Sequence, residues 1–212
     1  MNAFARLLLC TALSGLALGA QARTFEVSDF AELDNAVIEA EDGDEIVIKK
    51  GVYELEAPLE IFSRVTVRGE QGAVIDAGGR GSGFIVRVPK VRIENLTVRN
   101  YGGDLYARDA GVMVGDGADG TELVNLTLQG PGFGVRADRM NALVVEGCTI
   151  EGDAARHVLD RGDGIFLSYV KNARLNHNSL RNVRDGYYLE NVDAAKSDFN
   201  YFTGAQYGIH YM

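Results

Sequence analysis

An internal repeat near the C-terminal end of the chain constrains the fold more than any other feature of the sequence. When residues 161–212 are laid over themselves with a shift of 22, Gly164 aligns with Gly186, and Gly186 with Gly208. Repeats with periods of roughly 20 to 50 residues indicate stacked units, each of which buries its apolar face only against its neighbours. The sequence therefore predicts a solenoid.

Two markers, a recurring glycine and a recurring asparagine, extend the repeat back towards the middle of the chain. A coil of about 22 residues, with two longer coils, explains the spacing of both markers. The extra residues of the longer coils fall at 101–109 and 154–160, which we expect to form loops. We expect the asparagines to occupy one corner of each coil, in left-handed backbone geometry, and to hydrogen-bond along the stack. The glycine marker falls at Gly111, Gly134, Gly164, Gly186 and Gly208, and the asparagine marker at Asn95, Asn125, Asn178 and Asn200.

Short runs of β-branched residues, as at 45–49 and 65–67, predict short strands joined by turns. A helical spacing of apolar residues begins after Asp29 and ends before Gly43. Strands this short, without crossover helices, predict an all-β right-handed parallel β-helix over residues 23–212, whose first coil is covered by the short helix. Since no polar cap precedes the last residue, Met212, we expect a C-terminally truncated chain, the N-terminal part of a longer repeat protein.

Residues 1–22 have the features of a secretory signal peptide. Arg6 supplies a positive charge, residues 7–18 form an apolar run, and Ala20-Gln21-Ala22 is a small-x-small cleavage site. The run is too short to span a bilayer, so we expect an exported chain without a membrane span. After cleavage Cys148 is the only cysteine, which excludes an intramolecular disulfide and predicts a buried thiol.

The charge of the chain narrows the classes of partner. Its formal net charge is -9 at pH 7. An acidic surface repels phosphate backbones and anionic lipids, which argues against nucleic acid or a membrane surface as a general partner. Cations and cationic proteins fit this surface better.

Asp163 and Asp185 precede equivalent glycines one coil apart, which predicts two carboxylates about 5 Å from each other. Their repulsion requires neutralisation by the nearby Arg161 and Arg184, by a metal ion, or by a shared proton. The pair is therefore either a repeated Asp-Gly turn, a candidate metal site, or a carboxylate pair with the spacing of retaining glycosidases.

Phe166, Tyr188 and His210 fall in one column of the predicted stack, on the outer face. An exposed aromatic ladder of this kind is typical of a sugar-binding or protein-binding surface. His210 and Met212 are two residues apart, so their side chains lie on the same face of a strand. Imidazole and thioether are both ligands for Cu(I), which makes the two residues a candidate copper site.

Three segments carry a resemblance to a known family: Arg-Gly-Asp-Gly-Ile at 161–165, Arg-Asp-Gly-Tyr-Tyr-Leu-Glu at 184–190 and Tyr-Gly-Ile-His-Tyr-Met at 207–212. With looser motifs between residues 43 and 76, they make the mature chain similar to the NosD family. These are periplasmic β-helix accessory proteins of nitrous oxide reductase maturation.

The resemblance implies a periplasmic protein without catalytic residues. Its implied partners are an ABC transporter ATPase and permease, a copper-chaperone lipoprotein and nitrous oxide reductase. Its implied task is copper delivery for assembly of the copper-sulfur centre. The resemblance implies no metal ligand, so the prediction of a copper site at His210 and Met212 depends on their spacing alone.

A polysaccharide lyase, epimerase or hydrolase on the same scaffold is the competing hypothesis, because a fold does not fix a function. Asp160, Asp163 and Asp185 would then bind Ca²⁺ or act as acids, with Arg161 or Arg181 as base or charge neutraliser. Against it, the sequence lacks the tandem Asp-Asp, Gly-His-Gly and Arg-x-Lys motifs of polygalacturonases and the Asp-Pro-His-Asp motif of alginate epimerases. A purely structural or adhesive solenoid is a third possibility.

Overall fold

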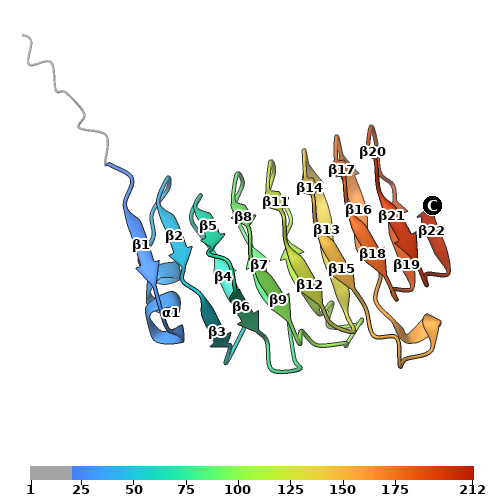
Figure 1. Cartoon of the computed structure of the whole chain (residues 1–212). Coiled ribbons are helices and arrows are strands. Elements are labelled where there is room, and N and C mark those ends of the chain that lie inside the picture. The colour runs from blue at the N-terminus through green and yellow to red at the C-terminus, as the bar shows by residue number, and fades with distance from the viewer. Residues whose placement is uncertain (1–20) are drawn as a thin grey trace, which may run out of the picture.

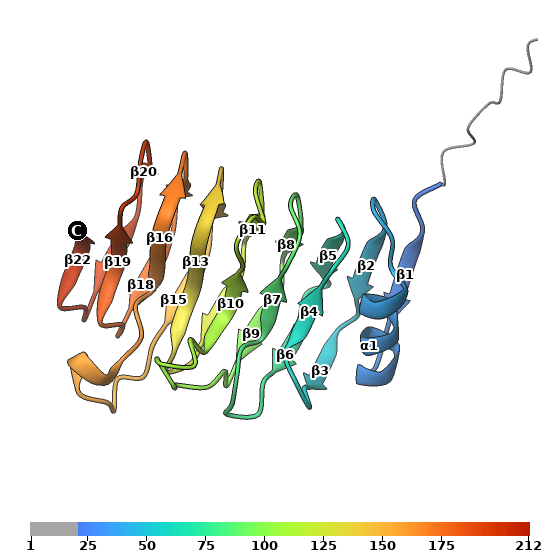
Figure 2. The same ribbon diagram turned by 180° about the vertical axis from the view of Figure 1, so that it is seen from behind.

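The computed structural model describes residues 21–212, which form a solenoid of three parallel sheets (Figures 1 and 2). Each sheet takes one strand from every successive coil, so the predicted parallel β-helix is confirmed. The first 20 residues, which hold most of the predicted signal peptide, lie outside the described part of the chain. None of the helices in residues 21–212 has the length and apolarity needed to cross a membrane.

The chain enters each coil through sheet A, turns into sheet B and leaves through sheet C. Sheet A contains β1 (Thr24–Val27), β2 (Glu45–Ile48), β5 (Thr66–Gly69), β8 (Arg92–Glu94), β11 (Glu122–Val124), β14 (Val144–Glu146), β17 (Arg174–Asn176) and β20 (Lys196–Asp198). Sheet B contains β3 (Gly51–Glu54), β6 (Ala73–Asp76), β9 (Thr97–Arg99), β12 (Thr127–Gln129), β15 (Thr149–Glu151), β18 (Ser179–Arg181) and β21 (Tyr201–Thr203). Sheet C contains β4 (Leu59–Ile61), β7 (Phe84–Val86), β10 (Ala110–Val114), β13 (Phe133–Asn141), β16 (Ile165–Lys171), β19 (Asp185–Glu190) and β22 (Tyr207–Tyr211).

The short helix α1 (Phe30–Glu39) covers the first coil, as predicted (Figure 1). The side chain of Asp29 caps it by accepting a hydrogen bond from the main-chain nitrogen of Glu32 at 2.9 Å. Leu33 and Ala36 are buried against the coil. Because the helix turns this apolar stripe inwards, it closes the N-terminal end of the core.

The register of sheet C confirms the repeat. Val135 pairs with Ile165, Ile165 with Tyr187, and Tyr187 with Ile209, so the glycines that precede these residues also form one column. A side chain on Gly134 would lie 2.5 Å from the carbonyl oxygen of Gly164 and would overlap Ile150 of sheet B. The column is glycine because the side chains of sheet B pack directly against the backbone of sheet C at this point.

The asparagine marker needs a correction, because its members occupy two different positions. From β8 onwards, each turn from sheet A to sheet B has two residues, and the first has positive φ: 58° at Asn95, 52° at Asn125 and 55° at His177. Asn178 and Asn200 take the second position of their turns, so the prediction of left-handed geometry is wrong for these two. At that position the side chain points into the coil, where an amide can satisfy buried backbone groups.

Both asparagine positions nevertheless hydrogen-bond along the stack. Asn125 donates from Nδ2 to Oδ1 of Asn95 at 3.2 Å on the outside of the turn. The buried Asn178 accepts from the main-chain nitrogen of Cys148 at 2.9 Å and donates to the carbonyl of Val145 at 2.9 Å. The predicted ladder therefore exists, in an outer and an inner form.

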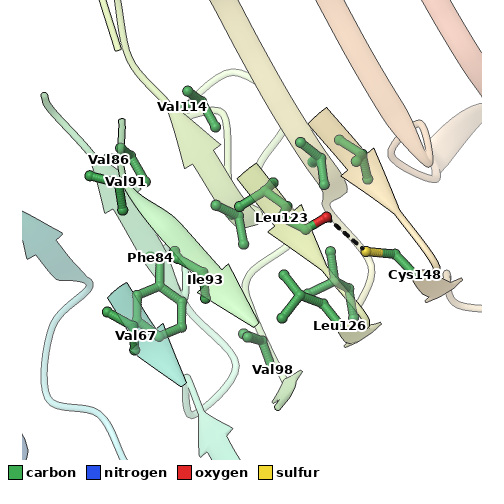
Figure 3. Close-up of a cluster of buried hydrophobic side chains, with 14 of the residues drawn as sticks. Val67, Phe84, Val86, Val91, Ile93, Val98, Val114, Leu123, Leu126 and Cys148 are labelled. Carbon is green, nitrogen blue, oxygen red and sulfur yellow. Dashed lines mark hydrogen bonds between the residues drawn. The ribbon is translucent and has the colours of Figure 1, made fainter. Parts of the chain in front are cut away.

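The interior of the solenoid is a single hydrophobic core that runs through the coils (Figure 3). Cys148 is buried in it, as predicted, and its thiol donates to the carbonyl of Leu123 at 3.6 Å (Figure 3). Burial raises the pKa of this thiol to about 11. It is a packing residue and holds its proton at neutral pH.

Two long loops leave the corner between sheets B and C, at 100–109 and 152–164, and project from the same edge of the solenoid (Figures 1 and 2). They contain the segments that the repeat lengths predict as loops. The second includes a short 3₁₀ turn, η1 (Val158–Asp160). Because they leave the same corner, the two loops lie beside one face of the molecule, the outer face of sheet C.

Candidate functional site

The outer face of sheet C carries a column of large side chains, one from each of five coils. Residue pairing between neighbouring strands places these side chains above one another. The column consists of Met113, Arg136, Phe166, Tyr188 and His210. The predicted alignment of Phe166, Tyr188 and His210 is confirmed.

The rings of the column stack on one another. Phe166 and Tyr188 lie parallel with centroids 5.0 Å apart, and Tyr188 meets His210 edge-on at 4.8 Å. The guanidinium of Arg136 lies 4.1 Å from the Phe166 centroid and is fixed by hydrogen bonds to Asp138 at 3.0 and 3.2 Å. Cation–π contact and ring stacking together hold the column rigid.

The column is less exposed than the sequence predicts. Phe166 is only 9% exposed, because Arg136, Tyr188 and Phe133 lie against its ring. Leu105 of the first long loop packs against the cluster that Phe166 forms with Phe133 and Ala110. Sequence spacing gives the alignment of a column but not what folds over it. The accessible end of the column is therefore Tyr188 and His210.

The two long loops enclose a cleft of about 710 Å³ beside the column. Its walls are held by internal hydrogen bonds: Arg161 donates to the carbonyls of Ala154 and Arg156, and Asp109 accepts from the main-chain nitrogen of Asp104. Such bonds leave the loops little freedom to close. The lining residues are Gly103, Asp104, Leu105, Tyr106, Phe133, Arg156, Leu159, Asp160 and Arg184.

Asp163 and Arg184 form an ion pair in which the carboxylate is buried and the guanidinium is partly exposed in the cleft. Arg184 donates from Nε and Nη2 to the two carboxylate oxygens at 2.9 and 2.6 Å, and the Asp163 side chain has no exposed surface. Burial raises the pKa of the Asp163 carboxyl, although the hydrogen bonds from Arg184 oppose the rise. Of the two arginines expected to neutralise the acids, Arg184 does so, whereas Arg161 binds loop carbonyls.

Asp185 holds His210. Its Oδ2 lies 2.9 Å from His210 Nδ1, and its side chain is 4% exposed. The other oxygen, Oδ1, is buried and has no hydrogen-bond partner among the described residues. A carboxylate that accepts from Nδ1 leaves Nε2 as the lone-pair nitrogen of the ring, the arrangement seen behind many metal-binding histidines.

Met212 follows His210 by two residues on the same face. It is 63% exposed, and its sulfur accepts a hydrogen bond from the Tyr188 hydroxyl at 2.8 Å. Residues 21–212 contain no group of three or more His, Cys, Asp or Glu placed to hold a metal ion. The face thus offers two soft donors, imidazole and thioether, rather than a cluster of carboxylates.

The acids that could act on a substrate are poorly placed for it. Asp163 is enclosed and engaged by Arg184, and Asp185 lies beneath His210. Asp160 is exposed and lines the cleft, in the loop that precedes Asp163. The structure therefore does not bring the three predicted acids together on one accessible surface.

Sequence reasoning missed Arg136, Phe133 and Asp138, which fix the column from one side. Arg136 was detectable, because it stands two residues after the marker glycine Gly134, as Phe166 does after Gly164. Phe133 precedes its glycine and carries no comparable signal.

A family model described as "Right handed beta helix region" matches residues 60–212. Two curated proteins named "Probable ABC transporter binding protein NosD" are similar to the chain. The protein from Stutzerimonas stutzeri is 39% identical over 137 residues, and the one from Pseudomonas aeruginosa is 36% identical over 136 residues. These matches confirm the resemblance to NosD.

The matches cover 65% and 64% of this chain but only 30% of each relative, so the chain corresponds to a limited part of those proteins. Among solved structures, a candidate glycosyl hydrolase from Parabacteroides merdae ATCC 43184 superimposes with a TM-score of 0.60. That match covers 87% of this chain and 96% of the other at 14% identity. At this identity the likeness supports the fold alone.

Proposed function

This chain belongs to the right-handed β-helix family, and on that premise we propose that it is a non-catalytic binding protein that works with an ABC transporter in copper delivery to nitrous oxide reductase. The similarity to two proteins named as ABC transporter binding proteins carries the proposal. Its partners would be the transporter ATPase and permease, a copper-chaperone lipoprotein and the reductase. Its place would be the periplasm.

Copper enters the proposal as cargo, and the outer face of sheet C supplies donors for it. His210 Nε2 in β22 and the sulfur of Met212, the residue that follows this strand, are soft ligands, and Asp185 orients the imidazole from behind. Two protein ligands leave coordination positions open, which suits a metal that must be passed to a partner. In this proposal Asp163 has a structural role and is not a copper ligand, because both its carboxylate oxygens accept hydrogen bonds from Arg184.

Competition for Cu(I) against a chromogenic chelator tests the ligands. We expect His210→Ala and Met212→Ala each to lower Cu(I) affinity by at least about tenfold, because each removes one of two donors. Asp185→Asn should lower it less, by weakening the orientation of the ring. His157→Ala, in the exposed second loop, is the matched control and should leave affinity unchanged. If all four variants bind Cu(I) as tightly as the parent protein, His210 and Met212 do not form a copper site.

A polysaccharide-active enzyme is the alternative, and the cleft between the two long loops is the observation that favours it. The cleft has room for a few sugar units and presents Asp160 and Arg156 to its contents. Release of unsaturated uronate from pectin or alginate would support this function. Its absence, together with Cu(I) binding, would support the accessory role.

Export gives a further prediction, because cleavage after Ala22 would turn the main-chain nitrogen of Arg23 into an α-ammonium group. That nitrogen lies 2.7 Å from Oδ1 of Asp44, and the Arg23 guanidinium holds Oδ2. Hydrogen bonds from the Arg23 side chain and main chain lower the pKa of Asp44 from 3.8 to about 2. The new charge would strengthen the contact.

We therefore expect a chain that starts at Arg23 to melt at a higher temperature than one with a Gly-Ser extension. The difference should vanish in Asp44→Asn. Because the folded-state pKa of Asp44 is depressed, its stabilising effect is present above pH 3.8 and is lost as the pH falls towards 2. N-terminal sequencing of the exported protein checks the cleavage, and a first residue other than Arg23 would contradict it.

A further inference from the structure

The N-terminal end of the solenoid carries an apolar groove between α1 and β4, here called the cap groove. It has a volume of about 480 Å³, and Val37, Pro58 and Leu59 contribute apolar lining. Ile38 and Phe62 also line it and are 74% and 64% exposed. The terminal caps of solenoids normally present a polar outer face. Two large exposed apolar side chains on one groove of a cap therefore point to a surface that is covered in use.

The charge around the cap groove is strongly negative. Residues 24–48 contain nine acidic residues and no lysine or arginine. Several of them are neutralised from elsewhere in the chain, through Arg23, Lys49, Arg64 and Arg68. The nine are Glu26, Asp29, Glu32, Asp34, Glu39, Glu41, Asp42, Asp44 and Glu45.

Among the described residues, Asp34 is an acid of the groove that has no basic partner. Asp34 lines the groove and forms no salt bridge within residues 21–212, whereas Glu39 lies outside the lining and has the Arg23 guanidinium at its own carbonyl, at 2.9 Å. Glu60, on the other side, is paired with Arg87 at 2.9 Å. At the C-terminal end of α1 the Arg23 guanidinium donates to the Glu39 carbonyl at 2.9 Å and offsets the negative end of the helix dipole, so the anionic character of the groove rests on Asp34. The groove is thus apolar at its floor and anionic along its helix side.

We propose that the cap groove docks a cationic amphipathic segment of a protein partner, with an apolar side chain between Ile38 and Phe62 and lysine or arginine facing Asp34. Charge complementarity selects this occupant over two others. An anionic lipid surface would be repelled by the acids, and a second copy of the chain would bring the same negative surface. The cap groove lies at the opposite end of the solenoid from β22 (Figures 1 and 2), so a partner docked there leaves His210 accessible.

A pair of synthetic amphipathic peptides tests the proposal, one of leucine and lysine and the other of leucine and glutamate. Fluorescence anisotropy of the labelled peptides should show that the processed chain binds the lysine peptide at least about tenfold more tightly than the glutamate peptide. Added salt should weaken that binding, since it screens the acids. Equal binding of the two peptides would overturn the proposal.

Variants locate the binding. Ile38→Ser and Phe62→Ser, both at exposed positions, should lower affinity for the lysine peptide by at least about tenfold without changing the thermal melt. Asp34→Asn should lower affinity and reduce its salt dependence. Tyr106→Ser, at a fully exposed loop tip, is the matched control and should bind as the parent does.

The alternative occupants have their own readouts. Light scattering should show no dimer that Phe62→Ser abolishes, and sedimentation with vesicles containing phosphatidylglycerol should recover no protein. A dimer or vesicle binding that depends on Phe62 would replace the proposed partner with a second copy or a membrane, and would overturn the proposal. None of these measurements involves copper or the outer face of sheet C. Their outcomes are therefore independent of the proposed function.

Discussion

Replacing Arg184 with methionine is expected to lower the free energy of unfolding by about 3 to 5 kcal/mol, the usual cost of breaking a buried ion pair from one side. The change leaves the Asp163 carboxylate without its two strongest hydrogen bonds, at 2.9 and 2.6 Å, in a position with no exposed surface. It also removes the guanidinium that lies 5.6 Å from the Tyr188 ring centroid. Urea unfolding at neutral pH measures the loss.

The defect of Arg184→Met should depend on pH. Burial already raises the folded-state pKa of Asp163, and without Arg184 the carboxyl would hold its proton more tightly still. A raised carboxyl pKa reduces stability as the pH rises above the ordinary value of 3.8, so the defect should be largest near neutral pH and smaller in acid. A defect of constant size across this range would contradict the explanation.

The double variant Asp163→Asn with Arg184→Met is the control. It removes the buried charge together with its partner, so we expect it to recover much of the lost stability. If the double variant is as unstable as Arg184→Met alone, packing rather than charge explains the loss.

Replacing Gly134 with alanine is expected to cost about 3 kcal/mol or more, at the upper end for overpacked cores. The added methyl would lie 2.5 Å from the carbonyl oxygen of Gly164 and would overlap Ile150. Neither the backbone of the next coil nor a buried side chain can move without disturbing the stack. Urea unfolding again measures the loss.

Gly208→Ala is the matched control, because Gly208 belongs to the same column. A side chain there would lie 3.4 Å from Phe202, which is an ordinary van der Waals contact. We expect a change within about 0.5 kcal/mol. Equal losses at Gly134 and Gly208 would show that backbone entropy, not close approach, is the reason for the glycines.

Much of the fold could be predicted from the sequence because a parallel β-helix repeats its own contacts. Once the spacing of Gly164, Gly186 and Gly208 is known, the strand residues that follow each glycine have known neighbours in the next coil. That rule also placed Phe166, Tyr188 and His210 in one column. The loops could be located from the lengths of the coils, since regular coils leave no other place for the extra residues.

The site was less predictable, because its contacts leave the repeat. The alignment of the asparagines was wrong in the last coils. Asn178 occupies the buried second position of its turn, whereas Asn95 and Asn125 occupy the outward first position, and asparagine fits both. The exposure of Phe166 depended on Phe133, which precedes its marker glycine and meets the Phe166 ring edge-on at 5.5 Å, and on the long loops, whose packing the repeat does not determine. The two arginines near the acids looked equivalent, and only their contacts separate Arg184 from Arg161.

The sequence by itself determined the period, the parallel stacking and the columns, because equivalent residues of successive coils must lie one strand spacing apart. Only the tertiary structure decided which side chains meet across neighbouring columns and what covers them. Asp185 contacts His210 of the next coil, and Arg184 contacts Asp163 of the preceding coil. Such ion pairs and hydrogen bonds depend on the length and direction of individual side chains. The physical reason is that strand register is set by a repeated backbone pattern, whereas side-chain contacts and loop packing are set by single residues that do not repeat.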